Sequence, residues 1–300
     1  MRPWSLALPF LLFAVLSAQP PPLVPPTPSP EATAATLHVQ IPLWPEGGMP
    51  LAKENPRAET INHKGGIAAV SRPSLVPFPL PPGQPNTGVA IIVFPGGGYS
   101  HLDWTNHVIA LTGQFHPRGV AVFALKYRTK ANAQDTAEAA LADAQRAVRL
   151  VRSRAGEHGI TCLGVVGYSA GANLAMRLAG SFDDGDPASA DPVARHSSRP
   201  DFIAGLSTWA YGRAESPFTF LKNTPPVFLG HADDDKGAPV ALALHIRRQL
   251  EALQVPVHLE RHDTGGHGAF HFMPNRSGAL WPDALLQWLD TRNLVLPPRS

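Results

Sequence analysis

The chain has 300 residues, a formal net charge of +2 and a single cysteine. This length fits one large α/β domain with extensions, because single domains of this class run to about 250 residues. Lys and Arg number 25 against 23 Asp and Glu and are scattered along the chain, which argues against a nucleic-acid-binding protein. The lone Cys162 excludes an intrachain disulfide, and we expect it to lie buried in a core strand.

The first residues have the pattern of a secretory signal peptide. Arg2 precedes an apolar run at residues 6–16, and Ser17 and Ala18 are small residues in front of a proline tract. The apolar run is too short to cross a bilayer. We therefore predict a signal peptide at 1–18, a secreted or periplasmic protein, and no stable membrane insertion after removal of the signal. A membrane anchor is the alternative.

The composition changes twice along the remaining chain. Seven prolines between residues 19 and 30 favour extended chain, so we predict a Pro-rich linker at 19–35. Residues 36–43 alternate loosely and predict a first strand. We expect one domain at 36–293 and a short C-terminal tail at 294–300.

From Val89 onward, apolar runs alternate with segments of helical periodicity. This arrangement is typical of a buried parallel sheet with crossover helices. Helices are expected around residues 137–151, 240–253 and 281–289. The sequence thus predicts an α/β protein with a doubly wound, mostly parallel sheet and helices on both faces. The expected strands are 89–94, 120–125, 163–166, 202–206, 227–229 and 257–259.

Residues 167–171, Gly-Tyr-Ser-Ala-Gly, have the G-x-S-x-G form of a nucleophile elbow. An expected strand precedes them and an alanine-rich helical pattern follows. A serine on so sharp a turn needs small residues two positions away, and Gly167 and Gly171 supply them. The helix after the serine would direct its positive end at an oxyanion. We therefore predict that Ser169 is a nucleophile.

A serine nucleophile needs a histidine to accept its proton and an acid to orient that histidine. In a doubly wound hydrolase these follow in the order serine, acid, histidine, on loops after successive strands. Three aspartates, 233–235, follow the strand expected at 227–229, and Gly-Gly-His-Gly at 265–268 follows the strand expected at 257–259. His267 is the predicted base, and Asp235 or Asp234 is the acid.

A glycine run, Gly96 to Gly98, follows the strand expected at 89–94. Glycines let backbone N–H groups approach a ligand oxygen without interference from side chains. We assign the oxyanion donors to the amides of Gly98 and Ala170, with Gly97 beside them. A flexible turn without a catalytic role is the alternative for this run.

Two aromatic residues just past expected strand ends, Tyr99 and Trp209, are predicted to contact substrate, because sugar rings stack on such side chains. The alternative is that they close the core. His262, His267 and His271 lie close in sequence without the spacing of a zinc site, so we predict no metal. Asp143 is expected to be a structural or capping carboxylate, and His101 and His107, near the glycine run, to be surface or supporting groups rather than catalysts.

Taken together, the motifs resemble the secreted bacterial α/β-hydrolase esterases grouped with acetyl xylan esterases and BD-FAE-type feruloyl esterases. The resemblance implies the eight-stranded sheet typical of α/β-hydrolases and no cofactor. It also implies an activity, the hydrolysis of small acyl esters, commonly acetyl groups on plant polysaccharide. It also implies that Asp235 is the acid, and Gly237-Ala238 departs from the family's β-branched pair, which predicts a looser loop. The matching segments are 41–45, 95–99, 125–128, 143–147, 167–171, 198–201, 231–240 and 265–268.

The sequence therefore predicts a secreted serine carboxylesterase of the α/β-hydrolase fold. It would release acetyl or feruloyl groups from a polysaccharide, an oligosaccharide or a small molecule through an acyl-enzyme. A serine peptidase of the same fold and a non-catalytic carbohydrate-binding protein are the alternatives. The preferred acyl group and the oligomeric state stay open at this stage.

Overall fold

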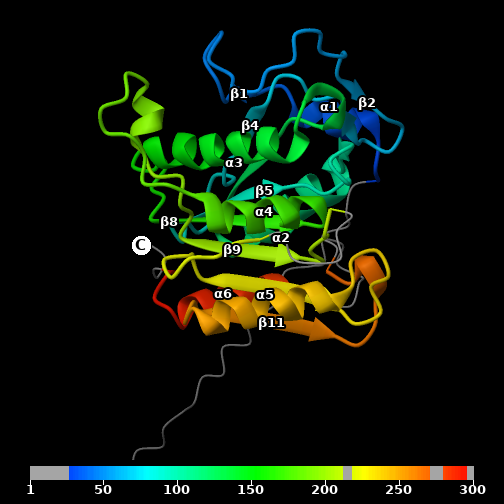
Figure 1. Cartoon of the computed structure of the whole chain (residues 1–300), viewed down its shortest axis with the longest axis vertical. Coiled ribbons are helices and arrows are strands. Elements are labelled where there is room, and N and C mark those ends of the chain that lie inside the picture. Colours follow the sequence, from blue (N-terminus) through cyan, green and yellow to red (C-terminus); the bar gives the residue numbers. More distant parts are fainter. Residues whose placement is uncertain (1–26, 212–217, 271–279, 296–300) are drawn as a thin grey trace, which may run out of the picture.

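The computed structural model describes residues 27–211, 218–270 and 280–295 (Figure 1). The signal peptide predicted at 1–18 and most of the tail predicted at 294–300 lie outside these ranges. Within them, no helix is both long and apolar enough to cross a membrane.

An eight-stranded sheet forms the centre of the fold, in the order β1-β4-β7-β5-β8-β9-β10-β11. Neighbouring strands from β7 to β11 pair in parallel, and β1 and β4 join that edge antiparallel. The predicted mostly parallel α/β sheet is confirmed. The strands are β1 Ile41–Pro42, β4 Ser74–Phe78, β5 Val89–Phe94, β7 Ala121–Lys126, β8 Cys162–Tyr168, β9 Phe202–Leu206, β10 Val227–Ala232 and β11 Val257–His262.

The two central strands, β5 and β8, are buried along their whole length. A strand covered on both faces must be apolar almost throughout, which is why these runs were visible in the sequence. Figure 1 shows helices both in front of and behind the sheet. The helices are α1 Pro30–Thr36, α2 Ala110–Phe115, α3 Thr136–Ser153, α4 Ala170–Ser181, α5 Val240–Ala252 and α6 Trp281–Asp290.

The linker predicted at 19–35 is wrong in its last part, because α1 begins at Pro30. The Ser29 hydroxyl caps this helix by accepting from the amide of Ala32 at 3.1 Å. Proline suits the first helical position, and Glu31 suits the first turn because its charge opposes the helix dipole. The strand predicted at 36–43 is likewise reduced to the two residues of β1.

A small antiparallel sheet adjoins the glycine run. It consists of β2 Thr60–Ile61, β3 Ile67–Ala68 and β6 His101–Leu102. Helix α1 is tied to the same region, since the Trp104 indole donates to the Thr36 hydroxyl at 2.8 Å. The N-terminal segment therefore braces the chain that follows the glycine run.

Asp143 on α3 is the structural carboxylate that the sequence predicted. It is fully buried with Arg128, whose Nε and Nη2 donate to its two oxygens at 2.9 and 2.8 Å. The indole of Trp44 donates to the same carboxylate at 2.9 Å. The buried Asp143 carboxylate thus connects helix α3 to the chain after β7 through Arg128, and to the segment after β1 through Trp44.

Candidate active site

Ser169 occupies a sharp turn between β8 and α4, with backbone angles of φ 54° and ψ −114°. A positive φ is strained for a residue other than glycine. A side chain at Gly167 would place its Cβ 2.3 Å from the Gly171 carbonyl oxygen, and one at Gly171 would come within 1.8 Å of the Phe94 carbonyl oxygen. The turn thus requires both glycines, for the steric reason that the sequence pattern indicated.

The structure brings Ser169, His267 and Asp235 into one hydrogen-bonded chain. His267 Nε2 lies 3.0 Å from Ser169 Oγ, and His267 Nδ1 lies 2.8 Å from Asp235 Oδ2. Asp235 follows β10, and His267 follows β11 in the short helix Gly266–Gly268. These strands are parallel neighbours, so their carboxyl ends meet at one edge of the sheet.

Asp235 is held as an ionised acceptor. Its Oδ1 accepts from the amides of Gly237 and Ala238 at 2.9 and 2.8 Å, while Oδ2 faces His267. Burial by itself would raise the pKa of this carboxyl, but the hydrogen bonds from His267 and Ala238 outweigh it and hold the pKa below its usual value. A carboxylate can only accept, so His267 Nδ1 carries a proton and Nε2 is free to accept one from Ser169.

The three consecutive aspartates have different partners, which decides between the acids left open by the sequence. Asp234 accepts from the amides of Gly265 and Gly266 at 3.2 and 2.7 Å. Asp233 pairs with Arg261, whose Nη2 lies 2.8 Å from its Oδ2. Only Asp235 of the three contacts the His267 ring in this structure.

The glycine run lies against the nucleophile. A Cβ added at Gly96 would lie 3.1 Å from Ser169 Cβ, and the Gly96 amide donates to His107 Nδ1 at 3.0 Å. Gly97 and Gly98 have φ values of 127° and 61°, conformations that favour glycine. The predicted supporting position of His107 agrees with this contact.

Two amides beside Ser169 are available as oxyanion donors. Among the described residues, neither the Gly98 amide nor the Ala170 amide donates to a carbonyl oxygen. Within the described ranges, a Cβ added at Gly98 would meet nothing closer than 4 Å. Ala170 is the first residue of α4, where amides have no partner inside the helix and the helix dipole is positive.

The predicted substrate contact of Tyr99 is wrong. Its side chain is fully buried, and its hydroxyl donates to Asn173 Oδ1 on α4 at 3.0 Å. The left-handed backbone at Tyr99, with φ 59°, turns this side chain into the core among Tyr127 and Tyr211. Burial raises the pKa of Tyr99, so the hydroxyl stays a neutral donor. It supports the glycine run from inside.

Trp209 remains a predicted substrate contact. It is half-buried, and its amide donates to the Ser169 carbonyl oxygen at 3.3 Å, so its backbone lies next to the nucleophile. Its ring packs edge-on against Tyr211 with centroids 5.5 Å apart.

Two supporting residues had no assigned role in the sequence analysis. His231, the fully buried fifth residue of β10, has its Nε2 2.5 Å from the Ala238 carbonyl oxygen and 3.7 Å from Asp235 Oδ2. Burial lowers the pKa of His231, so it is a neutral donor to Ala238. The Tyr168 hydroxyl donates to the His267 carbonyl oxygen. A histidine near the end of an apolar strand, four residues before the acid, was the available signal for His231.

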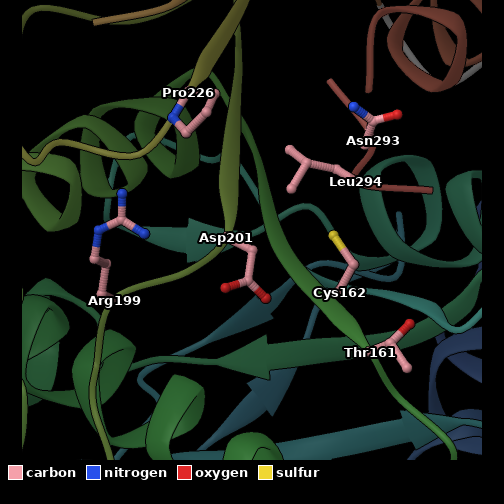
Figure 2. A pocket seen from close by; sticks show the side chains of 7 residues that line it. All are labelled: Thr161, Cys162, Arg199, Asp201, Pro226, Asn293 and Leu294. Atoms are coloured by element: carbon pink, nitrogen blue, oxygen red, sulfur yellow. The ribbon is translucent and has the colours of Figure 1, made fainter. Parts of the chain in front are cut away.

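A pocket of about 430 Å³ lies at the start of β8, the end opposite to Ser169. Figure 2 shows its lining, which includes Cys162, Arg199 and Asp201. Cys162 is buried as predicted, and burial raises the pKa of its thiol to about 12, which disfavours the reactive thiolate. Within the described ranges, no group of three or more His, Cys, Asp or Glu residues is arranged to bind a metal ion.

Comparison with known proteins agrees with this geometry. The BD-FAE family model matches residues 78–196, which include the glycine run and Ser169. A solved acetyl ester-xyloside bifunctional hydrolase from Caldicellulosiruptor lactoaceticus is 28% identical, with 91% of this chain and 99% of that chain covered and a TM-score of 0.70. No curated protein matches the chain significantly.

Two more distant structures share the fold. The carboxylesterase Cest-2923 from Lactobacillus plantarum is 17% identical, with 82% of this chain and 99% of that chain covered and a TM-score of 0.58. A butyrate-bound thermophilic esterase from Thermogutta terrifontis is 19% identical, with 84% and 98% covered and a TM-score of 0.61. The resemblance to esterases with a BD-FAE domain is therefore confirmed, and the chain is a serine ester hydrolase of the α/β-hydrolase fold.

Proposed function

We propose that this enzyme is exported from the cell and removes short acyl groups, acetyl or feruloyl, from plant polysaccharide or oligosaccharide. The similarity to an acetyl ester-xyloside hydrolase and to the BD-FAE model supports the substrate class. The signal-like pattern at 1–18 supports export to the periplasm or the medium.

The reaction starts with attack of Ser169 Oγ on the ester carbonyl carbon. His267 Nε2 takes the hydroxyl proton, and the Asp235 carboxylate stabilises the imidazolium that forms. The amides of Gly98 and Ala170, with Gly97 close by, donate to the oxyanion of the tetrahedral intermediate. Collapse of that intermediate breaks the ester bond, and the sugar alcohol leaves with the proton from His267.

Water completes the cycle. His267 takes a proton from a water molecule, which attacks the acyl carbon bound to Ser169. The second tetrahedral intermediate collapses, the acid leaves, and the proton returns from His267 to Ser169 Oγ. No step requires a metal ion or a cofactor.

One observation carries this proposal, namely the continuous hydrogen-bonded chain from Asp235 through His267 to Ser169. A base that lies 3.0 Å from its nucleophile and 2.8 Å from the acid that orients it has the geometry that acyl transfer needs. Trp209, half-buried beside this chain, is the proposed platform for a sugar ring.

Substitution of the nucleophile tests the chemistry. Ser169→Ala should lower p-nitrophenyl acetate hydrolysis by at least about 10³-fold and abolish labelling by a fluorophosphonate probe. Ser181→Ala is the matched control, because Ser181 is exposed at the other end of α4. Wild-type turnover in Ser169→Ala would overturn the assignment.

Two further assays test substrate and export. Rates on acetylated xylan, methyl ferulate and p-nitrophenyl esters of increasing chain length should be highest for the short or feruloyl esters. N-terminal sequencing of protein recovered outside the cytoplasm should find a start near Gln19. A preference for long-chain esters would contradict the proposed substrate class. A protein that stays in the cytoplasm with residues 1–18 still attached would contradict the proposed export.

A further inference from the structure

One aspartate joins the two loops that carry the acid and the base. The Asp234 carboxylate accepts from two consecutive amides, Gly265 at 3.2 Å and Gly266 at 2.7 Å, directly before His267. In the described part of the chain these amides are the only hydrogen-bond partners of the Asp234 side chain. The next residue, Asp235, binds the ring of His267.

The glycine turn before His267 has one further hydrogen bond on its far side, because the Ala269 amide donates to the Gly266 carbonyl oxygen at 3.1 Å. Gly265 and Gly266 have φ values of 127° and 59°, so both lie in conformations that other residues rarely adopt. Glycine also loses more backbone freedom on ordering than any other residue. The core packs against Ala269 and Phe270, which follow the short helix, whereas Gly265 is exposed and β11 is only partly buried, so packing restrains the turn from one side.

The contacts that His267 itself makes, which include the Ser207 hydroxyl 3.5 Å from its carbonyl oxygen, leave the amides of the turn free. The Tyr168 hydroxyl binds the His267 carbonyl, and Asp235 binds the ring at Nδ1. None of these contacts involves the peptide groups of Gly265 and Gly266. Charge-assisted hydrogen bonds to a carboxylate are the stronger kind, so Asp234 is the main restraint on the backbone that enters His267.

We propose that Asp234 is a positioning residue for catalysis, which holds the Gly265-Gly266 turn so that His267 Nε2 faces Ser169. This inference rests on the proposed role of His267 as the general base. It also gives the consecutive carboxylates separate tasks, because Asp235 orients the ring while Asp234 orders the backbone that carries it.

Loss of the Asp234 carboxylate should lower kcat and leave KM unchanged. Asp234 contacts neither the glycine run at 96–98 nor Ser169, so substrate binding is not affected directly. The released turn lets His267 leave the aligned geometry for much of the time. We expect kcat of Asp234→Ala to be about tenfold lower, the scale of one hydrogen bond to a charged group.

Kinetics of the full-length protein with p-nitrophenyl acetate test this expectation. Asp234→Asn keeps an oxygen that can accept from Gly266, so it should recover part of the loss and remain only about twofold to threefold slow. Asp233→Ala is the matched control, since it removes the same charge one residue away but frees Arg261 rather than the turn. Its kcat should stay within about twofold of wild type.

Amide hydrogen exchange provides a readout independent of activity. Peptides that contain Gly265 to Gly268 should exchange faster in Asp234→Ala than in wild type and in Asp233→Ala, while peptides of β5 and β8 should not change. This measurement also serves if Asp234→Ala is unstable, because Asp234→Asn can replace it.

The outcomes separate this inference from the proposed function. If wild type lacks Ser169-dependent turnover, the esterase proposal fails. Amide hydrogen exchange at residues 265–268 then decides by itself whether Asp234 orders the turn. If wild type is active, equal kcat in Asp234→Ala and Asp233→Ala would overturn the inference. An increase in KM without a fall in kcat, or unchanged exchange at 265–268, would overturn it as well.

Discussion

Asparagine at position 235 would change the hydrogen-bonding character of one atom with little change of shape. Its amide oxygen can still accept from Gly237 and Ala238, as Asp235 Oδ1 does at 2.9 and 2.8 Å. Its NH₂ group would then replace Oδ2, which lies 2.8 Å from His267 Nδ1. Because NH₂ only donates, Nδ1 must accept, and the ring proton moves to Nε2. Nε2–H cannot take the proton of Ser169.

The expected cost follows from this change of tautomer. Asp235→Asn should lower kcat about 10³- to 10⁴-fold, the scale found for the acid of a serine protease triad. At about 1.4 kcal/mol per factor of ten, this corresponds to about 4 to 5.5 kcal/mol of lost transition-state stabilisation. KM should change much less, because Asp235 is buried and does not face the substrate.

Steady-state kinetics with p-nitrophenyl acetate near neutral pH measure this effect, with Asp233→Asn as the matched control. A kcat for Asp235→Asn within about threefold of wild type would refute the assigned role of Asp235. Equal losses in the two variants would show that charge in this loop, rather than contact with His267, is what matters.

The same variant has a defined dependence of stability on pH. Burial raises the pKa of Asp235, but its hydrogen bonds with His267 and Ala238 lower the pKa by more than burial raises it. The pKa of Asp235 in the folded state is therefore below its ordinary value. A carboxyl whose pKa is lowered by folding stabilises the folded state fully at pH values above its unfolded pKa of about 3.9. This stabilisation is lost as the pH falls through the pKa of the folded state. Urea unfolding should therefore show wild type gaining stability relative to Asp235→Asn as the pH rises toward about 4, with the smallest difference in strong acid. A constant difference across this range would contradict the argument.

Three further predictions concern residues outside the triad. Asp143→Ala leaves Arg128 buried without its partner and should cost about 3–5 kcal/mol in urea unfolding, whereas a loss below about 1 kcal/mol would contradict the packing. Cys162, with its thiol pKa raised to about 12, should resist iodoacetamide at pH 8 in the folded protein and react in urea, and rapid alkylation without urea would disprove its burial. Tyr99→Phe should leave KM unchanged and cost about 1 kcal/mol of stability, because it removes only the bond to Asn173, and a large rise in KM would restore Tyr99 as a substrate contact.

Local steric rules made the sheet and the elbow predictable from sequence. The strand expected at 163–166 is the centre of β8, which is buried throughout and therefore apolar throughout. The glycines around Ser169 are required by contacts with backbone atoms of the elbow and of β5, and those contacts recur wherever a strand turns so sharply into a helix.

Features set by distant contacts were not predictable in this way. Strands β2 and β3 have two residues each, too few for a periodicity, and they form because Ile67 and Ala68 meet β6. Helix α1 did have a local signal, Ser29-Pro30-Glu31, but the surrounding prolines favoured a linker. Composition outweighed the capping residues in that prediction.

Chain order predicted which loops carry the site, but it could not assign directions to the side chains within them. Tyr99 shows the limit, because a single positive φ sends a residue past a strand end into the core. The three aspartates at 233–235 show it again. They are chemically identical, and only the backbone path after β10 determines that one meets Arg261, the next the glycine turn, and the last His267.

The acid loop shows how hydrogen bonds can replace side-chain packing. Gly237 and Ala238 occur where the resembling family has β-branched residues, which predicted a looser loop. In the structure both amides bind Asp235, and His231 binds the Ala238 carbonyl from the core. A Cβ added at Gly237 would lie 3.3 Å from Cγ of His267, so a bulkier residue would compete with the imidazole for the same space. The small residues therefore let the loop close on His267, and the buried histidine supplies the order that a larger side chain would otherwise provide.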